Sequence, residues 1–270
     1  MNTGNAAQVQ PPKTEPTMPS DDTERPPLAT VSSDPTPYYG NDLEVMQNLK
    51  NYQAWIMRWF GPYLCGKILE IGAGMGTFST QLAPRADHLD ALEPDATQFT
   101  SLKQKQTHHL PNSALFNCTS EAFFAEDARP NTYDAVFMVN VLEHIEDDEA
   151  CIRQVYNALK PGGTFCVFVP ALQQLYGPLD KILGHYRRYH RDPMHQQFTN
   201  AGFNVKTCRY FDLLGTLPWW LVNVKIGKTS AGRTLPIVYD RIGVPLTRLC
   251  EKLITPPTGK NVLLIAQKPE

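Results

Sequence analysis

The chain has 270 residues, of which 42% are hydrophobic and 19% are charged, so it holds enough apolar material for a buried core. Its 25 basic and 27 acidic residues give a formal charge of −2, which lacks the basic excess that binding to nucleic acid requires. The six cysteines stand singly, and no apolar run reaches the ~20 residues of a membrane-spanning helix. We therefore expect a globular, soluble, cytoplasmic protein with reduced thiols and no nucleic-acid partner.

The first 37 residues are rich in proline and hold few large apolar side chains. Such a segment cannot bury enough surface to offset the entropy lost on ordering. Residues 1–37 are predicted to be a disordered tail, and they do not resemble a signal peptide, because no apolar core follows a basic segment. Residues 38–270 are predicted to form one domain.

Strands and helices alternate along that domain. Apolar residues at helical spacing predict one or two helices within 42–59. The pattern then predicts, in order, strand 67–71, helix 77–82, strand 88–92, helix 95–106, strand 114–116, strand 133–139, helix 147–159 and strand 164–169. Two further strands are expected at 205–211 and 262–266. The alternation predicts an α/β fold with a doubly wound, seven-stranded, mostly parallel sheet.

Two segments depart from this alternation. Residues 173–200 are rich in Tyr, His and Arg, and residues 213–258 are rich in Trp, Leu and Pro. Ligands of open α/β sheets bind outside the carboxyl ends of the strands, so both segments are predicted to form a lid over the substrate. For the second segment, covering an edge of the sheet is an equally good interpretation.

A glycine-rich turn, Gly72-Ala73-Gly74-Met75-Gly76, directly follows the first strand. Glycine lets the backbone approach a ligand closely, and the N–H groups that begin the next helix point at it. A nicotinamide dinucleotide site requires G-x-G-x-x-G, but here Thr77 stands at the last position and Gly76 comes one residue early. Glu70 would also repel a pyrophosphate, whereas it suits a ligand that carries an ammonium group. An NAD-dependent oxidoreductase is therefore disfavoured.

Further motifs follow in a fixed order: Glu93 ends the second strand, L-E-H stands at 142–144, and L-K-P-G-G at 159–163. Together with the turn, they resemble the class I S-adenosylmethionine-dependent methyltransferases of small molecules, over roughly residues 42–211. The resemblance implies a Rossmann-like fold and S-adenosyl-L-methionine as cofactor. It further implies that the ribose diol binds Glu93, since a carboxylate can accept from both hydroxyls. The full set of implied cofactor contacts is Glu70, Gly72, Ala73, Gly74, Gly76, Thr77, Glu93, Pro94, Thr119, Ser120, Asn140 and Val141.

Two histidines are candidate catalytic bases. His144 follows the fourth strand, although it could instead line the cofactor pocket. His185 belongs to G-H-Y-R-R-Y-H at 184–190, which with Asp180 resembles a D-x-x-x-G-H-x-R-R-Y pattern of a subset of methyltransferases. His185, His190 and His195 are spaced by five and fall on different helix faces, so no metal site is predicted.

The same cluster is a candidate substrate grip, because two arginines flanked by tyrosines can hold an anionic or planar group by hydrogen bonding and stacking. A structural ion-pair network that closes the lid is the equal alternative. The predicted substrate-binding residues are Tyr186, Arg187, Arg188, Tyr189 and Trp219.

The acceptor is predicted to be a small molecule, because the N-P-P-Tyr/Phe motif of nucleobase methyltransferases is replaced by Val139-Asn140-Val141-Leu142. We expect O-methylation of a hydroxyl or carboxyl group. N- or C-methylation of a small or lipid-like metabolite is the main alternative, ahead of an oxidoreductase and of a non-catalytic membrane-associated binding module. Trp219 and its neighbours match an apolar acceptor or a peripheral membrane contact.

Overall fold

The computed structural model describes residue 1 and residues 46–126, 129–227 and 234–270. The predicted tail at 1–37 lies outside the described residues, apart from Met1. Within the described residues, no helix combines the length and the apolar character needed to cross a bilayer.

Seven strands form one sheet in the order β3-β2-β1-β4-β5-β7-β6. β1 to β5 pair with one another in parallel, and β7 runs antiparallel to both β5 and β6. The doubly wound, seven-stranded, mostly parallel sheet is therefore confirmed. The strands are β1 (Gly66–Ile71), β2 (Ala86–Leu92), β3 (Ser113–Phe116), β4 (Tyr133–Val139), β5 (Leu159–Pro170), β6 (Asn204–Phe211) and β7 (Asn261–Gln267).

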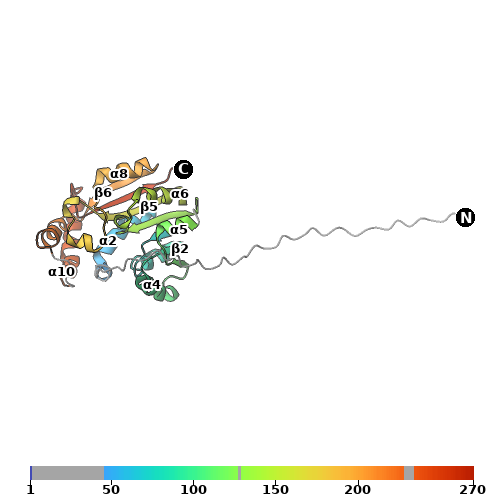
Figure 1. The fold of residues 1–270 in the computed structure, drawn as a ribbon, viewed down its shortest axis with the longest axis horizontal. Helices are drawn as coiled ribbons and strands as arrows, with labels where there is room; N and C mark the ends of the chain where they lie inside the picture. Colours follow the sequence, from blue (N-terminus) through green and yellow to red (C-terminus); the bar gives the residue numbers. More distant parts are fainter. Residues whose placement is uncertain (2–45, 127–128, 228–233) are drawn as a thin grey trace.

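Helices cover both faces of the sheet (Figure 1). Side chains of α5, α6 and α8 pack on one face, and side chains of α2, α3, α4 and α11 pack on the other. Central strands are buried on both faces, which is why β4 has the nearly continuous apolar sequence YDAVFMV. The α-helices are α2 (Lys50–Phe60), α3 (Ser79–Leu82), α4 (Ala96–His109), α5 (Ser120–Glu126), α6 (Asp148–Ala158), α7 (Pro178–Ile182), α8 (Arg191–Asn200), α9 (Thr216–Trp219), α10 (Thr234–Val238) and α11 (Val244–Leu253).

Local sequence signals set several helix ends. Asp95 caps α4 by accepting a hydrogen bond from the N–H of Gln98 at 2.9 Å, and Asp147 caps α6 in the same way.

Two boundaries in the structure differ from those that the sequence predicted. The helix after the glycine turn begins only at Ser79, since turns occupy the residues before it, and β5 begins at Leu159, so the K-P-G-G sequence lies within the strand.

The segment 173–200 contains the 3-10 turn η4 (Gln173–Leu175), α7 and α8. Met194 and Phe198 of α8 lie in the core against the sheet, so α8 is the crossover helix that leads into β6. The part before α8 runs past the end of β4, where the main-chain N–H of Tyr186 donates to the carbonyl of Glu143 at 2.8 Å. This earlier part therefore lies over the carboxyl end of β4.

The segment from Leu213 to Ile254 is helical over most of its described length and includes the π-helical turns η5 (Trp220–Lys225) and η6 (Tyr239–Gly243). It is anchored to α2, because the Asp240 carboxylate accepts hydrogen bonds from the backbone N–H groups of Asn51 and Tyr52 at 3.1 and 2.9 Å. Tyr52 and Trp55 of α2 are themselves buried in the core beside Phe211. The substrate-lid assignment of both segments stays a prediction.

Candidate functional site

The predicted cofactor residues follow four strands that are neighbours in the sheet, β3, β2, β1 and β4. Because these strands are parallel, the loops after them meet at one edge. The N–H groups of Gly72 and Ala73 donate to the carbonyl of Leu92 at 3.0 and 2.8 Å, and the N–H of Gly74 donates to the Glu93 carboxylate at 2.7 Å. The turn after β1 is thus joined to the end of β2.

The conformation of the turn requires glycine. Gly72, Gly74 and Gly76 have φ values of +76°, +56° and +79°, a region that other residues rarely adopt. A Cβ on Gly72 would also lie 2.2 Å from a methyl carbon of Val141, in the loop after β4. The glycine turn and the β4 loop therefore lie in direct contact.

Two buried carboxyl groups face this turn. Glu70, at the end of β1, accepts a hydrogen bond from the Ser79 hydroxyl, and its burial raises the pKa to about 8. Burial also raises the pKa of Glu93 to about 7, against the hydrogen bonds that its carboxylate receives from Asp95 and Gly74. Buried acids with strongly raised pKa values cluster at functional sites, so this turn is a candidate binding site.

The remaining predicted cofactor contacts occupy the same edge. Thr119 accepts a hydrogen bond from the N–H of Ala122 and Ser120 begins α5, while Asn140 has a φ of +53° and donates its N–H to Phe168 at 2.8 Å. Pro94 follows Glu93 directly. Gly76 and Thr77 border a pocket of about 470 Å³ on the side of α2, which is lined by Gln47, Lys50, Gln53, Gly76, Thr77, Thr80, Gln81 and Lys105.

The structure brings the two candidate bases together. The imidazole rings of His144 and His185 stand at 84° with their centroids 4.6 Å apart. Burial, with a smaller effect of His185, lowers the pKa of His144 to about 4, so this ring is neutral at physiological pH. The Nδ1 atom of His185 lies 2.8 Å from the Asp180 carboxylate, which fixes the orientation of its ring.

The arginine and tyrosine cluster divides into two parts. Arg188 is buried, pairs with Asp180 at 2.8 Å and donates to the Ala171 carbonyl, and the hydroxyl of buried Tyr189 donates to Asp148 at 2.8 Å. These contacts favour the ion-pair network over substrate binding for these two residues.

The rest of the cluster is more accessible. Tyr186 is exposed, and Arg187 is partly exposed and pairs with Asp148 at 2.8 Å. The Cζ atom of the Arg188 guanidinium lies over the ring of Trp219, 5.1 Å from the centroid of that ring. Tyr186 and Arg187 remain the more accessible candidates for substrate contact.

Sequence reasoning did not single out Glu143 as a site residue. Its side chain is fully buried, and neither carboxylate oxygen has a hydrogen-bond partner among the described residues. The Nε2 atom of His185 lies 4.0 Å from one carboxylate oxygen, and burial raises the pKa of Glu143 to about 7. The L-E-H motif could have drawn attention to Glu143. Its burial without a hydrogen-bond partner, however, depends on the later segment around Tyr186, which packs over it.

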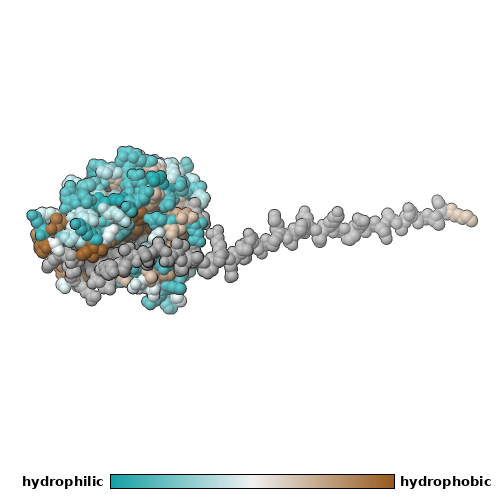
Figure 2. Space-filling model, viewed as in Figure 1, coloured by the Kyte–Doolittle hydropathy of each residue, from teal (hydrophilic) through white to brown (hydrophobic). Residues whose placement is uncertain are grey.

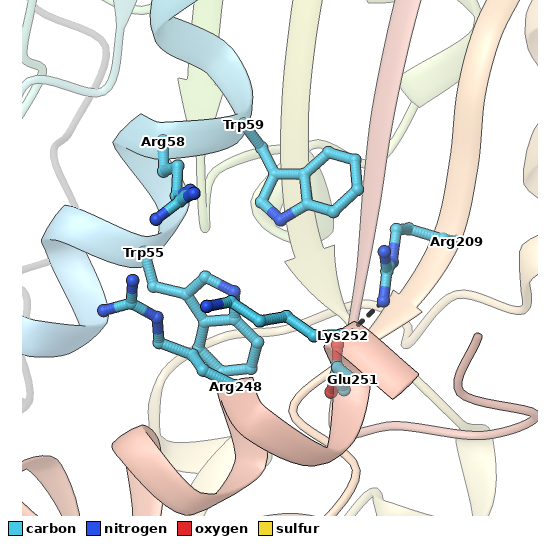
Figure 3. Close-up of a pocket in the computed structure, with 7 residues that line it drawn as sticks. All are labelled: Trp55, Arg58, Trp59, Arg209, Arg248, Glu251 and Lys252. Atoms are coloured by element: carbon cyan, nitrogen blue, oxygen red, sulfur yellow. Dashed lines mark hydrogen bonds and ion pairs between the residues drawn. The ribbon is translucent and has the colours of Figure 1, made fainter. Parts of the chain in front are cut away.

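A second pocket, of about 270 Å³, lies away from the glycine turn, between α2, β6 and α11 (Figure 3). Its lining is strongly basic and includes two tryptophan rings. Arg209 pairs with Glu251 at 2.9 Å, whereas Figure 3 marks no such contact between the drawn residues for Arg58, Arg248 or Lys252. The lining residues are Trp55, Arg58, Trp59, Arg209, Arg248, Glu251 and Lys252.

Comparison with known proteins agrees with this geometry. Residues 69–165 match a family model described as a methyltransferase domain. An uncharacterized protein of Mycobacterium tuberculosis is 30% identical over 115 residues, which cover 41% of this chain and 38% of the relative. The ubiquinone biosynthesis O-methyltransferase of Idiomarina loihiensis is 32% identical over 99 residues, which cover 36% of this chain and 39% of the relative. The chain thus matches about two fifths of the length of these curated relatives.

Solved structures share the fold over most of the chain. A putative S-adenosylmethionine-dependent methyltransferase from Listeria monocytogenes superposes with a TM-score of 0.56 and 14% identity, over 83% of this chain and 100% of the other. The shared fold and the matched domain both include the strands β1 to β4, at whose edge the predicted cofactor residues gather. Residues 69–165 thus match a methyltransferase domain, and the chain shares the Rossmann-like fold of this putative S-adenosylmethionine-dependent methyltransferase.

Proposed function

We propose that the protein transfers a methyl group from S-adenosyl-L-methionine to a hydroxyl or carboxyl oxygen of a small molecule. The observation that carries this proposal is the joining of the glycine turn to Glu93, with the buried Glu70 beside them. O-methylation of the acceptor is supported by the similarity to ubiquinone biosynthesis O-methyltransferases. Methylation at nitrogen or carbon of a small or lipid-like acceptor is the alternative.

Each part of the site has a proposed task. Glu70 would balance the ammonium charge of the cofactor, the backbone from Gly72 to Gly76 would hold its methionine part, and Glu93 would accept from the ribose hydroxyls. The cofactor supplies a methyl group on a cationic sulfur. Holding the acceptor oxygen in line with that methyl group, away from water, is the main task left to the chain.

His144 is the proposed general base for a hydroxyl acceptor, because its ring lies at the end of β4 beside His185. Burial lowers the pKa of this ring to about 4, which keeps it unprotonated but also makes it a weak base. With the cofactor bound, the acceptor oxygen would take the methyl group, the sulfur would keep the electron pair of the broken bond, and the imidazole would take the hydroxyl proton. Tyr186 and Arg187 lie on the segment beside His185 and are the proposed acceptor contacts.

Calorimetric titration with S-adenosylmethionine tests the first step. We expect heat of binding with the wild-type chain and its loss in Gly74→Asp, which places a carboxylate in the turn beside Glu93. Absence of binding by the wild-type chain would refute the proposal. Incubation with labelled cofactor and a metabolite extract, followed by identification of the labelled product, then defines the acceptor.

We further propose that the surface formed by residues 213–227 and 234–254, called the lid patch below, rests on an anionic lipid bilayer. This lid patch exposes many large apolar side chains, and Figure 2 shows brown surface at the end of the molecule where Figure 1 labels α10. On α11, Leu246, Leu249 and Leu253 lie on one face and are 52%, 58% and 80% exposed. The other apolar members of the patch are Leu214, Leu217, Leu221, Ile226, Leu235, Val238, Ile242 and Ile254.

Charge around the lid patch favours an anionic bilayer over other apolar partners. Its described cations are Lys225, Arg241, Arg248 and Lys252, and the last two also line the basic pocket of Figure 3. Its described acids are turned inward, because Asp240 caps α2 and Glu251 pairs with Arg209. Apolar side chains with a basic rim are typical of helices that lie in the interface of anionic membranes.

Vesicle flotation tests this surface. The chain should float with phosphatidylglycerol vesicles and much less with phosphatidylcholine vesicles, and Leu249→Glu with Leu253→Glu should abolish flotation. Arg248→Gln should weaken it, whereas Arg153→Gln, on the exposed face of α6, is the matched control. Equal flotation with both lipids, no flotation, or a patch covered by a second copy of the chain in sedimentation would each contradict the proposal.

A further inference from the structure

We propose that Glu143, His144 and His185 bind a divalent transition-metal ion at the end of β4. One carboxylate oxygen of Glu143 and one ring nitrogen of each histidine lie within 4.8 Å of one another. Glu143 and His144 belong to the short 3-10 turn η3 (Leu142–His144), and His185 comes from the segment that crosses this turn. The three donors thus converge from two parts of the chain at the edge where the acceptor is proposed to bind.

The state of Glu143 is the first argument for a ligand. Its side chain is fully buried, and within the described chain no group donates a hydrogen bond to either carboxylate oxygen. A buried carboxylate without donors bears the full cost of leaving water, which is why such groups are normally paired or bound to a metal. The 4.0 Å separation from the Nε2 atom of His185 is too long for a hydrogen bond and leaves space between the two donors.

The second argument is the way in which the ring of His185 is held. The Nδ1 atom of His185 donates to the Asp180 carboxylate at 2.8 Å, which leaves its Nε2 atom 4.0 Å from the Glu143 carboxylate. The ring of His144 stands beside that of His185, with the centroids 4.6 Å apart. Metal-binding histidines almost always use their other ring nitrogen in this way, with a carboxylate or a backbone carbonyl as acceptor.

Asp180 is itself rigidly placed. Its carboxylate accepts hydrogen bonds from the Arg188 guanidinium at 2.8 Å, from the N–H of Gly177 at 2.9 Å and from the Asn223 amide at 3.2 Å. The D-x-x-x-G-H-x-R-R-Y pattern therefore acquires a physical explanation. Its aspartate and second arginine position the histidine ring, and the histidine completes the donor set.

The donor set indicates the kind of ion. Two imidazole nitrogens and one carboxylate oxygen suit Zn²⁺, Fe²⁺ or Mn²⁺, whereas Mg²⁺ and Ca²⁺ prefer oxygen donors alone. Metal–ligand distances of about 2.0–2.2 Å require the three donors to draw closer together when the ion binds. Three protein ligands leave open positions, as in catalytic rather than structural sites.

The role of the ion rests on the proposed methyl transfer, although its binding does not. An ion in this position would bind the acceptor hydroxyl and lower its pKa. With both imidazoles engaged as ligands, the hydroxyl proton would leave to solvent rather than to His144. Dependence of turnover on metal therefore separates this arrangement from simple base catalysis.

Cobalt(II) is a suitable probe, because its visible absorption reports the donor set. The full chain, stripped of metal with a chelator, should bind a single Co²⁺ ion with the spectrum of nitrogen and oxygen ligands. Glu143→Gln, which preserves side-chain shape, and His185→Ala should each weaken binding at least ~10-fold, and Asp180→Asn should weaken it ~10–100-fold through the orientation of the ring. His195→Ala, an exposed position on α8, is the matched control and should bind like the wild type.

Three results would overturn the inference: no Co²⁺ binding by the wild-type chain, unchanged affinity in Glu143→Gln, or an intense thiolate band that places the ion on cysteine. Circular dichroism establishes that each variant is folded. Titration with S-adenosylmethionine is measured separately. Cofactor binding without Co²⁺ binding refutes the metal site alone, and Co²⁺ binding without cofactor binding supports the metal site while refuting the proposed function.

Discussion

The backbone N–H of Gly74 donates a 2.7 Å hydrogen bond to the carboxylate of Glu93, which joins the turn after β1 to the end of the neighbouring strand β2. The other oxygen of Glu93 accepts from the N–H of Asp95. The carboxylate is therefore fixed in place, and each oxygen retains a lone pair for a further donor. The Glu93 side chain thus orders the turn after β1 and the end of β2, and its oxygens can still accept a hydrogen bond from a ligand.

Glu93→Ala should weaken the binding of S-adenosylmethionine about 10–100-fold, because hydrogen bonds to a charged group contribute about 1.5–3 kcal/mol each. Calorimetric titration measures the change. Asp87→Ala removes an exposed carboxylate at the opposite end of the same strand and is the matched control. Equal affinities in the two variants would show that Glu93 does not contact the cofactor.

The raised pKa values of Glu70 and Glu93 predict a pH dependence of stability. Burial raises them from 4.5 to about 8 and about 7, and the proximity of Glu93 adds to the shift of Glu70. The folded state therefore holds more protons than the unfolded state above the unfolded pKa. The stability that these two groups contribute to the cofactor-free protein should be fully present below that pKa and lost as pH rises through the two folded values.

Urea denaturation at a series of pH values measures this slope, and Glu70→Gln should flatten it. A cationic cofactor favours the ionised carboxylates, so its affinity should rise over the same pH range and its binding should release protons. Calorimetry in buffers of different ionisation enthalpy detects that release. A stability that increases steadily toward pH 8 would contradict the assignment.

His144→Ala and His185→Ala should each lower turnover more than ~10-fold while the affinity for S-adenosylmethionine stays nearly unchanged, because both rings lie on the acceptor side of the proposed site. The labelled product identified from the extract provides the assay. His195→Ala serves again as the control. If both variants retain full turnover, the chain acts by positioning alone.

Much of the fold was predictable because its signals are local. The apolar run of β4, the glycine turn after β1 and the capping residues Asp95 and Asp147 each act within a few residues of their own position. The order of motifs along the chain likewise predicted that the candidate cofactor residues would gather, since parallel strands bring the loops after them to one edge.

The pairing of His144 with His185 and the burial of Glu143 could not be predicted in this way. They depend on how the segment before α8 folds back over the end of β4, which no local pattern encodes. The spacing of five residues predicts that His185, His190 and His195 lie on different faces of a helix. The structure instead places His185 in a loop after α7, beside residues of η3.

The ion pair between Asp180 and Arg188 is buried on both sides, so removing one charge should be costly. Asp180→Asn leaves the guanidinium without its counter-charge and should destabilise the fold by ~3–5 kcal/mol in chemical denaturation. Glu149→Gln breaks an exposed ion pair with Arg153 and should cause no measurable change in stability.

Because a buried ion pair can be replaced by apolar groups, Asp180→Asn combined with Arg188→Met should recover part of the lost stability. Equal destabilisation by the single and double variants would mean that Asp180 acts through its contacts with Gly177 and Asn223 rather than through its charge.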